Sequence, residues 1–212
     1  MSENHVQIAP KRRERRDARE NRQQILAVAK QLFAAQGIDS TTMHEIARAA
    51  GVGQGTLYRH FADKGTLCHD LIKADLAAFE ERVSAMIGGA GVAASPLARL
   101  EILIAEKNRL TESHLPLFAA MEETPAGVRR GKPFRGPFHS WLHEQISNLL
   151  DQAIVQGEVA PLDVAFTADA LLAAVAPQLY RDQRQNHGYS SERIMAGMRR
   201  LFVDGLRRDP VA

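Results

Sequence analysis

The sequence predicts an all-α protein made of a small N-terminal domain and a larger C-terminal one. Apolar residues recur at three- and four-residue spacing along most of the 212 residues, which is the period of an amphipathic helix. No segment alternates apolar and polar residues as a half-buried strand does. Positive charge is concentrated early: residues 1–64 hold 11 Lys and Arg against 7 Asp and Glu, whereas residues 65–212 hold 16 against 18.

These observations divide the chain into three parts. Residues 1–16 are polar and basic, and we expect a disordered arm. Residues 17–62 predict a three-helix domain, in which a helix begins near Asp17 and ends at Gly37. Residues 63–212 predict a helical domain large enough to hold its own core.

Composition excludes several classes of protein. The hydrophobic content of 45% is ordinary for a globular protein, and no apolar run approaches the roughly 20 residues that span a bilayer. No apolar region follows the basic N-terminus, so a signal peptide is not expected. The single cysteine, Cys68, excludes an intrachain disulfide and any multi-cysteine metal site. We therefore expect a cytoplasmic protein that does not enter the membrane.

Residues 42–61 predict two short helices joined by one tight turn. Thr42 begins the first helix and Glu45 follows three positions later, which is the pattern of a capping box. Gly51 can adopt the positive φ that ends a helix. Gly53 to Tyr58 then form a second short helix. A helix, a glycine turn and a second short helix make a helix-turn-helix, whose second helix can enter the major groove of DNA.

The stretch from Ala47 to Lys64, with the pattern AxxAGVxxGTLYxHFxxK, resembles the DNA-binding signature of the TetR family of bacterial transcription regulators. The resemblance implies a sequence-specific regulator, most often a repressor, that binds a palindromic double-stranded DNA operator. It also implies a C-terminal domain that holds an unknown small-molecule effector, with a homodimer formed through the last two long helices, at about 164–207. No cofactor is implied.

The second short helix carries the polar residues that could contact DNA. Gln54 and Thr56 can reach base edges, and Gly55 permits close approach of the backbone. The resemblance assigns phosphate contacts to Tyr58, His60 and Lys64. The predicted DNA-binding residues are Thr41, Thr42, Gln54, Gly55, Thr56, Tyr58, Arg59, His60 and Lys64. The basic stretch 11–22 fits either a phosphate-touching arm or a solvated tail.

Helical spacing continues through the C-terminal part. It predicts helices over 64–86, 97–110, 115–121, 138–156, 164–185 and 191–206, with a loop over most of 124–137. Pro177 should kink the helix over 164–185. That helix is too rich in apolar and alanine residues to have a solvated face, so we expect a two-fold partner to cover it. Burial within one subunit is the alternative.

Apolar and aromatic residues on the central helices could surround a ligand. The candidates are Met86, Ile104, Asn108, Phe118, Met121, Phe138, Trp141 and Val175. Ordinary core packing is the alternative for each of them. His139 and His143 are four apart on a predicted helix, with Glu144 adjacent, but no third metal ligand has diagnostic spacing. We therefore interpret the two histidines as surface residues.

No phosphate-binding glycine loop, nucleophile elbow or carboxylate pair is present, so an enzyme is not predicted. Two other classes remain open. A small-molecule binding protein without DNA recognition is disfavoured by the polar residues from Gln54 to Lys64. A nonspecific DNA-associated structural protein is disfavoured by the slightly acidic C-terminal part.

Overall fold

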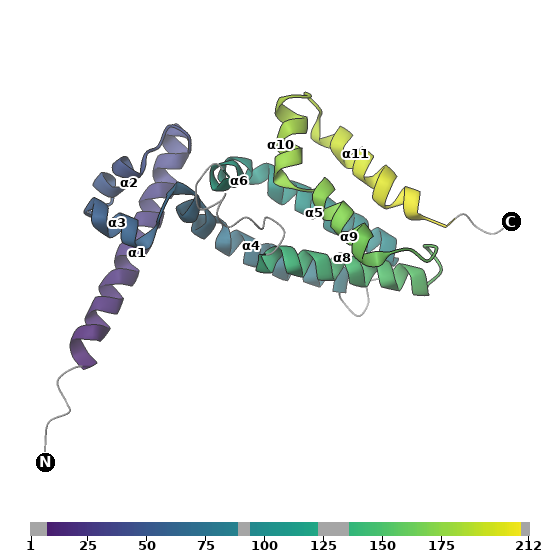
Figure 1. The fold of residues 1–212 in the computed structure, drawn as a ribbon, viewed down its shortest axis with the longest axis horizontal. Helices are drawn as coiled ribbons and strands as arrows, with labels where there is room; N and C mark the ends of the chain where they lie inside the picture. Colours follow the sequence, from purple (N-terminus) through teal and green to yellow (C-terminus); the bar gives the residue numbers. More distant parts are fainter. Residues whose placement is uncertain (1–7, 89–93, 123–135, 209–212) are drawn as a thin grey trace, which may run out of the picture. The chain divides into compact units, whose positions relative to one another are not determined.

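The structure, a computed structural model, describes residues 8–88, 94–122 and 136–208, and these ranges are helical, as predicted (Figure 1). Their α-helices are α1 (Ile8–Gln36), α2 (Met43–Ala49), α3 (Gln54–His60), α4 (Lys64–Gly88), α5 (Pro96–Ser113), α6 (Leu115–Glu122), α8 (Pro137–Val155), α9 (Val164–Ala174), α10 (Pro177–Gln185) and α11 (Ser191–Phe202). One short 3₁₀ helix, Asp204–Leu206, follows. β pairing in the described part is limited to an isolated bridge between Val159 and Arg207. None of the described helices is long and apolar enough to cross a bilayer.

The chain folds as two compact units. The first contains residues 1–72 and 120–129, and the second contains residues 73–119 and 130–212. The division falls inside α4, after Ile72, whereas the sequence suggested a boundary at 62/63. Helix α4 therefore begins in the first unit and ends in the second, so it joins them covalently.

The core of the first unit is built by α1, α2, α3 and the start of α4. Its buried residues are Ile25, Ala29, Ile46, Ala47, Ala50, Leu57, Phe61 and Leu67. Phe61 is fully buried, and the Arg22 guanidinium lies 5.1 Å from the centre of its ring. Arg22 also forms an ion pair with Asp70 of α4. This contact links α1 to α4 across the edge of the core.

Helix α1 begins at Ile8, earlier than the expected start near Asp17. The sequence 11–20 is rich in arginine and glutamate, which are good helix formers, and Arg16 pairs with Glu20 one turn later at 3.5 Å. Residues 8–16 of the expected disordered arm are thus helical, and residues 1–7 lie outside the described part. The basic stretch 11–22 was interpreted as either a phosphate-touching arm or a solvated tail, and its arginine and glutamate residues also suit a solvated helix.

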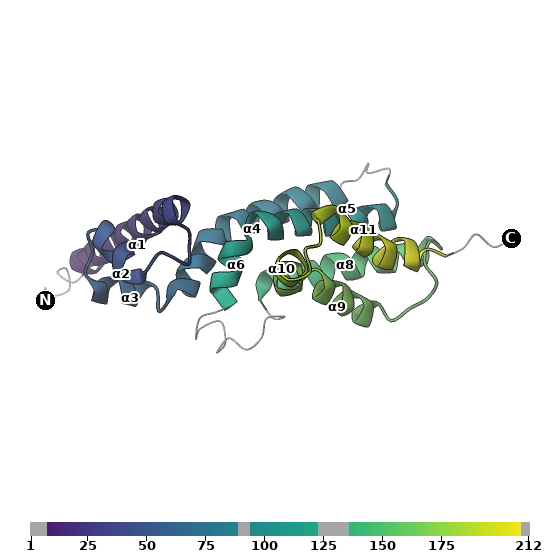
Figure 2. The same cartoon turned by 90° about the horizontal axis from the view of Figure 1, so that it is seen from above.

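The second unit is a bundle in which α5 packs on α8, α8 on α9, and α11 on α5 (Figures 1 and 2). Its centre is apolar: Leu100 and Leu103 of α5 meet Ile146 and Leu150 of α8 in the same buried cluster. Hydroxyl or carboxylate caps begin several of its helices. The cap residues are Ser95, Asp163 and Ser190.

Pro177 divides the predicted helix 164–185 into α9 and α10 instead of kinking it. Ala176 is extended, with φ −64° and ψ 139°, and Pro177 occupies the first turn of α10. Proline lacks an N–H and disfavours the α conformation in the residue before it, so the helix ends and restarts. The predicted loop 124–137 lies outside the described residues except for its last two, and Pro137 already belongs to α8.

Candidate functional site

The helix-turn-helix is fixed by local hydrogen bonds that the sequence predicted. The Thr42 N–H donates to Glu45 Oε2 at 2.8 Å, and the Glu45 N–H donates to Thr42 Oγ1 at 3.2 Å. The Thr42 N–H and the Thr42 hydroxyl both donate to the Glu45 carboxylate and lower its pKa. Gly51 has a φ of 67°, a conformation that suits glycine, and its turn brings the Val52 N–H to the Ala47 carbonyl at 3.0 Å. The turn therefore sets the angle between α2 and α3.

Helix α3 buries one side and presents the other to solvent. Leu57 is fully buried and anchors the helix, whereas Gln54, Gly55 and Arg59 are exposed. Tyr58 is 51% exposed, which is unusual for a large aromatic side chain. The Gln54 amide is hydrogen-bonded to the ring of His44 on α2. An exposed face that combines amides, hydroxyls and arginine is suited to reading a polar groove.

The side chains of Thr41 and Lys64, two predicted DNA contacts, form hydrogen bonds within the first unit. Thr41 is fully buried, and its hydroxyl donates to the Gly37 carbonyl at 2.7 Å. The Lys64 ammonium donates to the carbonyls of Ile38 and Thr41, at 2.8 and 3.1 Å. These bonds hold the connection between α1 and α2 against the start of α4. Sequence reasoning missed this internal role, because it depends on contacts more than twenty residues apart along the chain.

His60 ends α3 and is partly buried. Burial lowers the pKa of its imidazole, and the positive charges of Arg22 and Arg59 lower it further. The ring is therefore neutral at physiological pH, and it can offer an N–H without bringing a charge. Arg59 donates to the Thr56 hydroxyl at 3.1 Å, which orders the exposed side of the helix.

The predicted ligand residues are distributed over both units. Met121 is grouped with the first unit, and the other candidates belong to the second. In the second unit Phe138 and Trp141 stack with ring centres 6.1 Å apart, and Phe79 meets both rings edge-on. Ile104, Asn108 and Val175 are buried, whereas Met86 is 39% exposed. Aromatic and apolar groups thus gather around α4 and α8.

The second unit also buries polar groups that the sequence analysis did not select. Lys107 is 5% exposed and Thr111 is fully buried, although both lie on the apolar side of α5. The Lys107 ammonium donates to the Thr111 hydroxyl at 2.7 Å and to the Val175 carbonyl at 3.2 Å. The signal was available: Lys107 continues the stripe formed by Leu100, Leu103 and Ile104.

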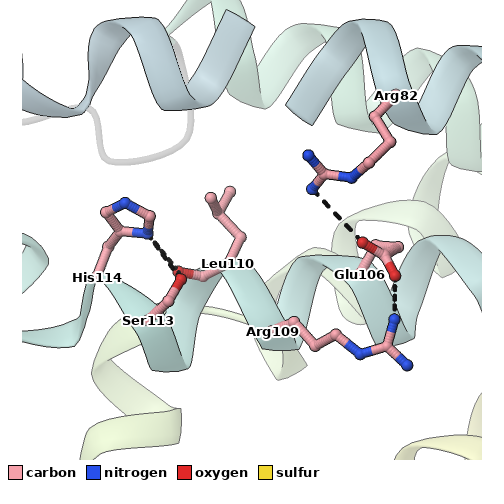
Figure 3. Close-up of polar contacts among 6 residues, drawn as sticks. All are labelled: Arg82, Glu106, Arg109, Leu110, Ser113 and His114. Carbon is pink, nitrogen blue, oxygen red and sulfur yellow. Dashed lines mark hydrogen bonds and ion pairs between the residues drawn. The ribbon is translucent and has the colours of Figure 1, made fainter. Parts of the chain in front are cut away.

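Glu106 is next to Lys107 in the sequence, but its carboxylate faces two arginines (Figure 3). Its carboxylate lies 3.5 Å from Arg82 Nη2 on α4 and is also paired with Arg109 on α5. The side chain is almost entirely buried, so the two arginines supply the opposite charge that a buried carboxylate needs.

The described residues contain no group of three His, Cys, Asp or Glu side chains that could hold a metal ion. His143 Nε2 lies 3.5 Å from Asp169 on α9, and burial lowers the pKa of His139. Cys68 is buried as well, and burial raises the pKa of its thiol to about 12. The cysteine is therefore an inert apolar side chain.

Comparison with known proteins agrees with this geometry. Residues 25–71 match the family described as bacterial regulatory proteins, tetR family. An HTH-type transcriptional regulator of Staphylococcus aureus is 49% identical over 65 residues, which are 31% of this chain and 35% of that protein. The chain therefore matches only about a third of the length of its curated relatives.

Solved structures extend the likeness of fold to most of the chain. A transcriptional regulator of the TetR/AcrR family from Thermobifida fusca superposes with a TM-score of 0.62 at 23% identity, covering 89% of this chain and all of that one. NalD, the secondary repressor of the MexAB-OprM multidrug efflux pump in Pseudomonas aeruginosa, gives 0.62 at 22% identity, with 91% and 100% coverage. The helix-turn-helix and the matched residues lead to one conclusion: residues 25–71 belong to the family described as bacterial regulatory proteins, tetR family, and most of the chain shares the fold of solved regulators of the TetR type.

Proposed function

We propose that the protein is a homodimeric transcription regulator that binds a palindromic operator as a repressor and is released by a small molecule. The observation that carries this proposal is the solvent-facing side of α3, where Gln54, Gly55 and Tyr58 lie opposite the buried Leu57. The family that residues 25–71 match is one of regulators. A DNA-bound role would place the protein in the bacterial cytoplasm.

DNA binding would use α3 as the recognition helix. In a two-fold dimer the two copies of α3 would enter successive major grooves, about 34–36 Å apart. Gln54 and Thr56 would face base edges, while Thr42, Tyr58, Arg59 and His60 would contact phosphates. The neutral His60 ring would donate a hydrogen bond, and Arg59 would supply charge. We propose that Lys64 acts mainly by fixing the loop before α2, with one of its N–H groups left for phosphate.

Dimerisation through residues 164–207 is supported by apolar side chains that one protomer leaves in water. Phe166 of α9 is 71% exposed and Leu201 of α11 is 65% exposed. Exposed apolar residues of this size within residues 164–207 fit a covered interface. Leu201→Glu should convert the dimer to a monomer in light scattering, and Met86→Glu is the control, because Met86 is exposed outside this region. A monomeric wild type contradicts the dimer.

Ligand release would require the effector to favour one arrangement of the two recognition helices over another. Helix α4 is the covalent link that could carry such a change, since it begins in one unit and ends in the other. The separation of Tyr58 between protomers should therefore differ with and without effector. Equal Tyr58 separations with and without effector would contradict this mechanism.

The deciding experiment is binding to the DNA that flanks the protein's own gene, with scrambled duplex as competitor, at two salt concentrations. Selective binding that Tyr58→Ala weakens at least tenfold, which is about 1.4 kcal/mol, supports a sequence-specific regulator. Val155→Ala, which trims a side chain that is 86% exposed in the second unit and outside residues 164–207, should leave the affinity unchanged. Equal binding to both duplexes indicates a nonspecific DNA-associated protein, and no binding indicates a sensor without DNA recognition.

A further inference from the structure

The second unit contains a buried lysine whose partners are all uncharged. Lys107 Nζ is held by the Thr111 hydroxyl, by the Val175 carbonyl and by the face of Phe118, whose centre lies 5.8 Å away. These partners come from three segments: α5, α6 and the break between α9 and α10. An ammonium group has three N–H donors, and the two oxygens use two of them. One donor remains for a further acceptor.

No acidic side chain of the described residues forms an ion pair with Lys107. The nearest acid along the chain, Glu106, is already held by Arg82 and Arg109 (Figure 3). Burial alone lowers the pKa of Lys107 to about 8, and no charged side chain contributes to that change. The group is therefore mostly protonated at neutral pH, and none of the acidic side chains that the structure describes compensates its positive charge.

An uncompensated buried charge is costly, and proteins usually bury charges in pairs. Packing alone gives no reason for a lysine here, because Leu100, Leu103 and Ile104 fill the same stripe of α5 with apolar side chains. A methionine would fill a similar volume without the cost. A role in binding explains the charge, since an incoming anion would gain a strong interaction in surroundings of low polarity.

We propose that the effector of this protein is an apolar carboxylic acid and that Lys107 binds its carboxylate inside the second unit. The identity of the ligand as an effector rests on the function proposed above. One lysine balances one negative charge, so a carboxylate fits, whereas a dianionic phosphate would leave a charge buried and unpaired. The surroundings fit an apolar body, because Ile104 and Val175 belong to the same core that Phe138 and Trp141 pack against.

The test uses the full chain and its single tryptophan, Trp141, as a fluorescent reporter. The probes are decanoate, laurate and naphthoate, each compared with its uncharged methyl ester. We expect at least one acid to bind the wild type ten or more times more tightly than its ester. Lys107→Met should remove that preference, while the ester binds both proteins alike. Arg109→Met is the matched control, because it removes an exposed positive charge from the same helix and should keep the preference.

Three results would overturn the inference: no acid binds, acids and esters bind the wild type equally, or Lys107→Met keeps the preference. If the variant does not fold, the comparison of acid and ester on the wild type still decides. The proposed function fails separately. If the wild type binds acids but no operator, the carboxylate site is supported and the regulatory function is rejected. If only an uncharged molecule releases the protein from DNA, the regulatory function is supported and the acid effector is rejected.

Discussion

The two units use buried lysines in opposite ways. In the first unit Lys64 is half-buried and binds two backbone carbonyls of a nearby loop, so its role is to hold that loop in place. In the second unit Lys107 is almost fully buried and is held by a hydroxyl, a carbonyl and an aromatic ring. A lysine at the edge of a domain keeps water on one side, whereas a lysine in the core has none. Similar hydrogen bonds thus have different consequences: those of Lys64 fix a loop, whereas those of Lys107 leave a buried charge that we propose binds a ligand.

The largest effect should come from separating the two cores. Phe61→Ala deletes a fully buried ring from the first unit and should cost that unit about 3–5 kcal/mol. The second unit has its own apolar cluster, so its helices should stay folded. Hydrogen exchange followed by mass spectrometry should find protection lost over residues 16–72 and kept over 136–208.

The matched control is Phe79→Ala, which deletes a fully buried ring from the second unit. It should give the reverse pattern, with protection lost over 136–208. Simultaneous loss of protection in both units, from either variant, contradicts the division into two cores.

A smaller effect should come from Lys107→Met, whose influence on stability should depend on pH. Its pKa falls from 10.5 to about 8 on folding, so the unfolded chain binds the proton more tightly. The cost of the buried charge is fully present below pH 8 and is relieved as the pH rises toward 10.5. Lys107→Met lacks this cost at every pH. The stability of the variant relative to wild type should therefore be greater at about pH 7 than at about pH 10, by roughly 1–3 kcal/mol.

Urea unfolding at both pH values measures this difference. Cys68 acts in the other direction above pH 9, because its thiol pKa is raised from 9.0 to about 12 on folding and stability falls as the unfolded thiol ionises. Both proteins contain Cys68, so the comparison cancels it. A difference that does not depend on pH would mean that folding does not shift the pKa of Lys107.

The smallest effect belongs to the cap of α2. Thr42→Ala removes the hydroxyl that accepts from the Glu45 N–H and donates to the Glu45 carboxylate, and it should destabilise the first unit by about 1 kcal/mol. Operator affinity should fall as well, because the cap also fixes the start of the helix that supports α3. Thermal unfolding and DNA binding measure the two changes. Ser190→Ala, at the cap of α11, is the control and should leave DNA binding intact.

Sequence reasoning succeeded where the determining contacts are local. The capping box of Thr42 and Glu45 and the turn at Gly51 involve neighbours within a few residues, and all were predicted before the fold was known. The all-helical class and most helix ends followed from the same local signals. The start of α1 was wrong because arginine and glutamate suit both a tail and a helix. Pro177 was recognised, but whether it kinks or interrupts a helix depends on what surrounds it.

The predictions failed where contacts join distant parts of the chain. The Lys107 site brings together residues from α5 and from the end of α9, which are 68 positions apart. Helical periodicity identified the apolar side of α5 but could not predict that the end of α9 would pack against it. The resemblance assigned a phosphate contact to Lys64, but its bonds to the carbonyls of Ile38 and Thr41, 26 and 23 positions away, became visible only in the folded chain.

The buried thiol of Cys68 has a practical consequence. Because it is shielded and stays protonated at ordinary pH, a maleimide should not react with it in the folded protein. The natural chain thus behaves as a cysteine-free background for labelling. Ala49→Cys would introduce one reactive group on the exposed side of α2, beside the recognition helix. In the proposed dimer, spin labels attached there would report the distance between the two helix-turn-helix domains with and without a bound ligand.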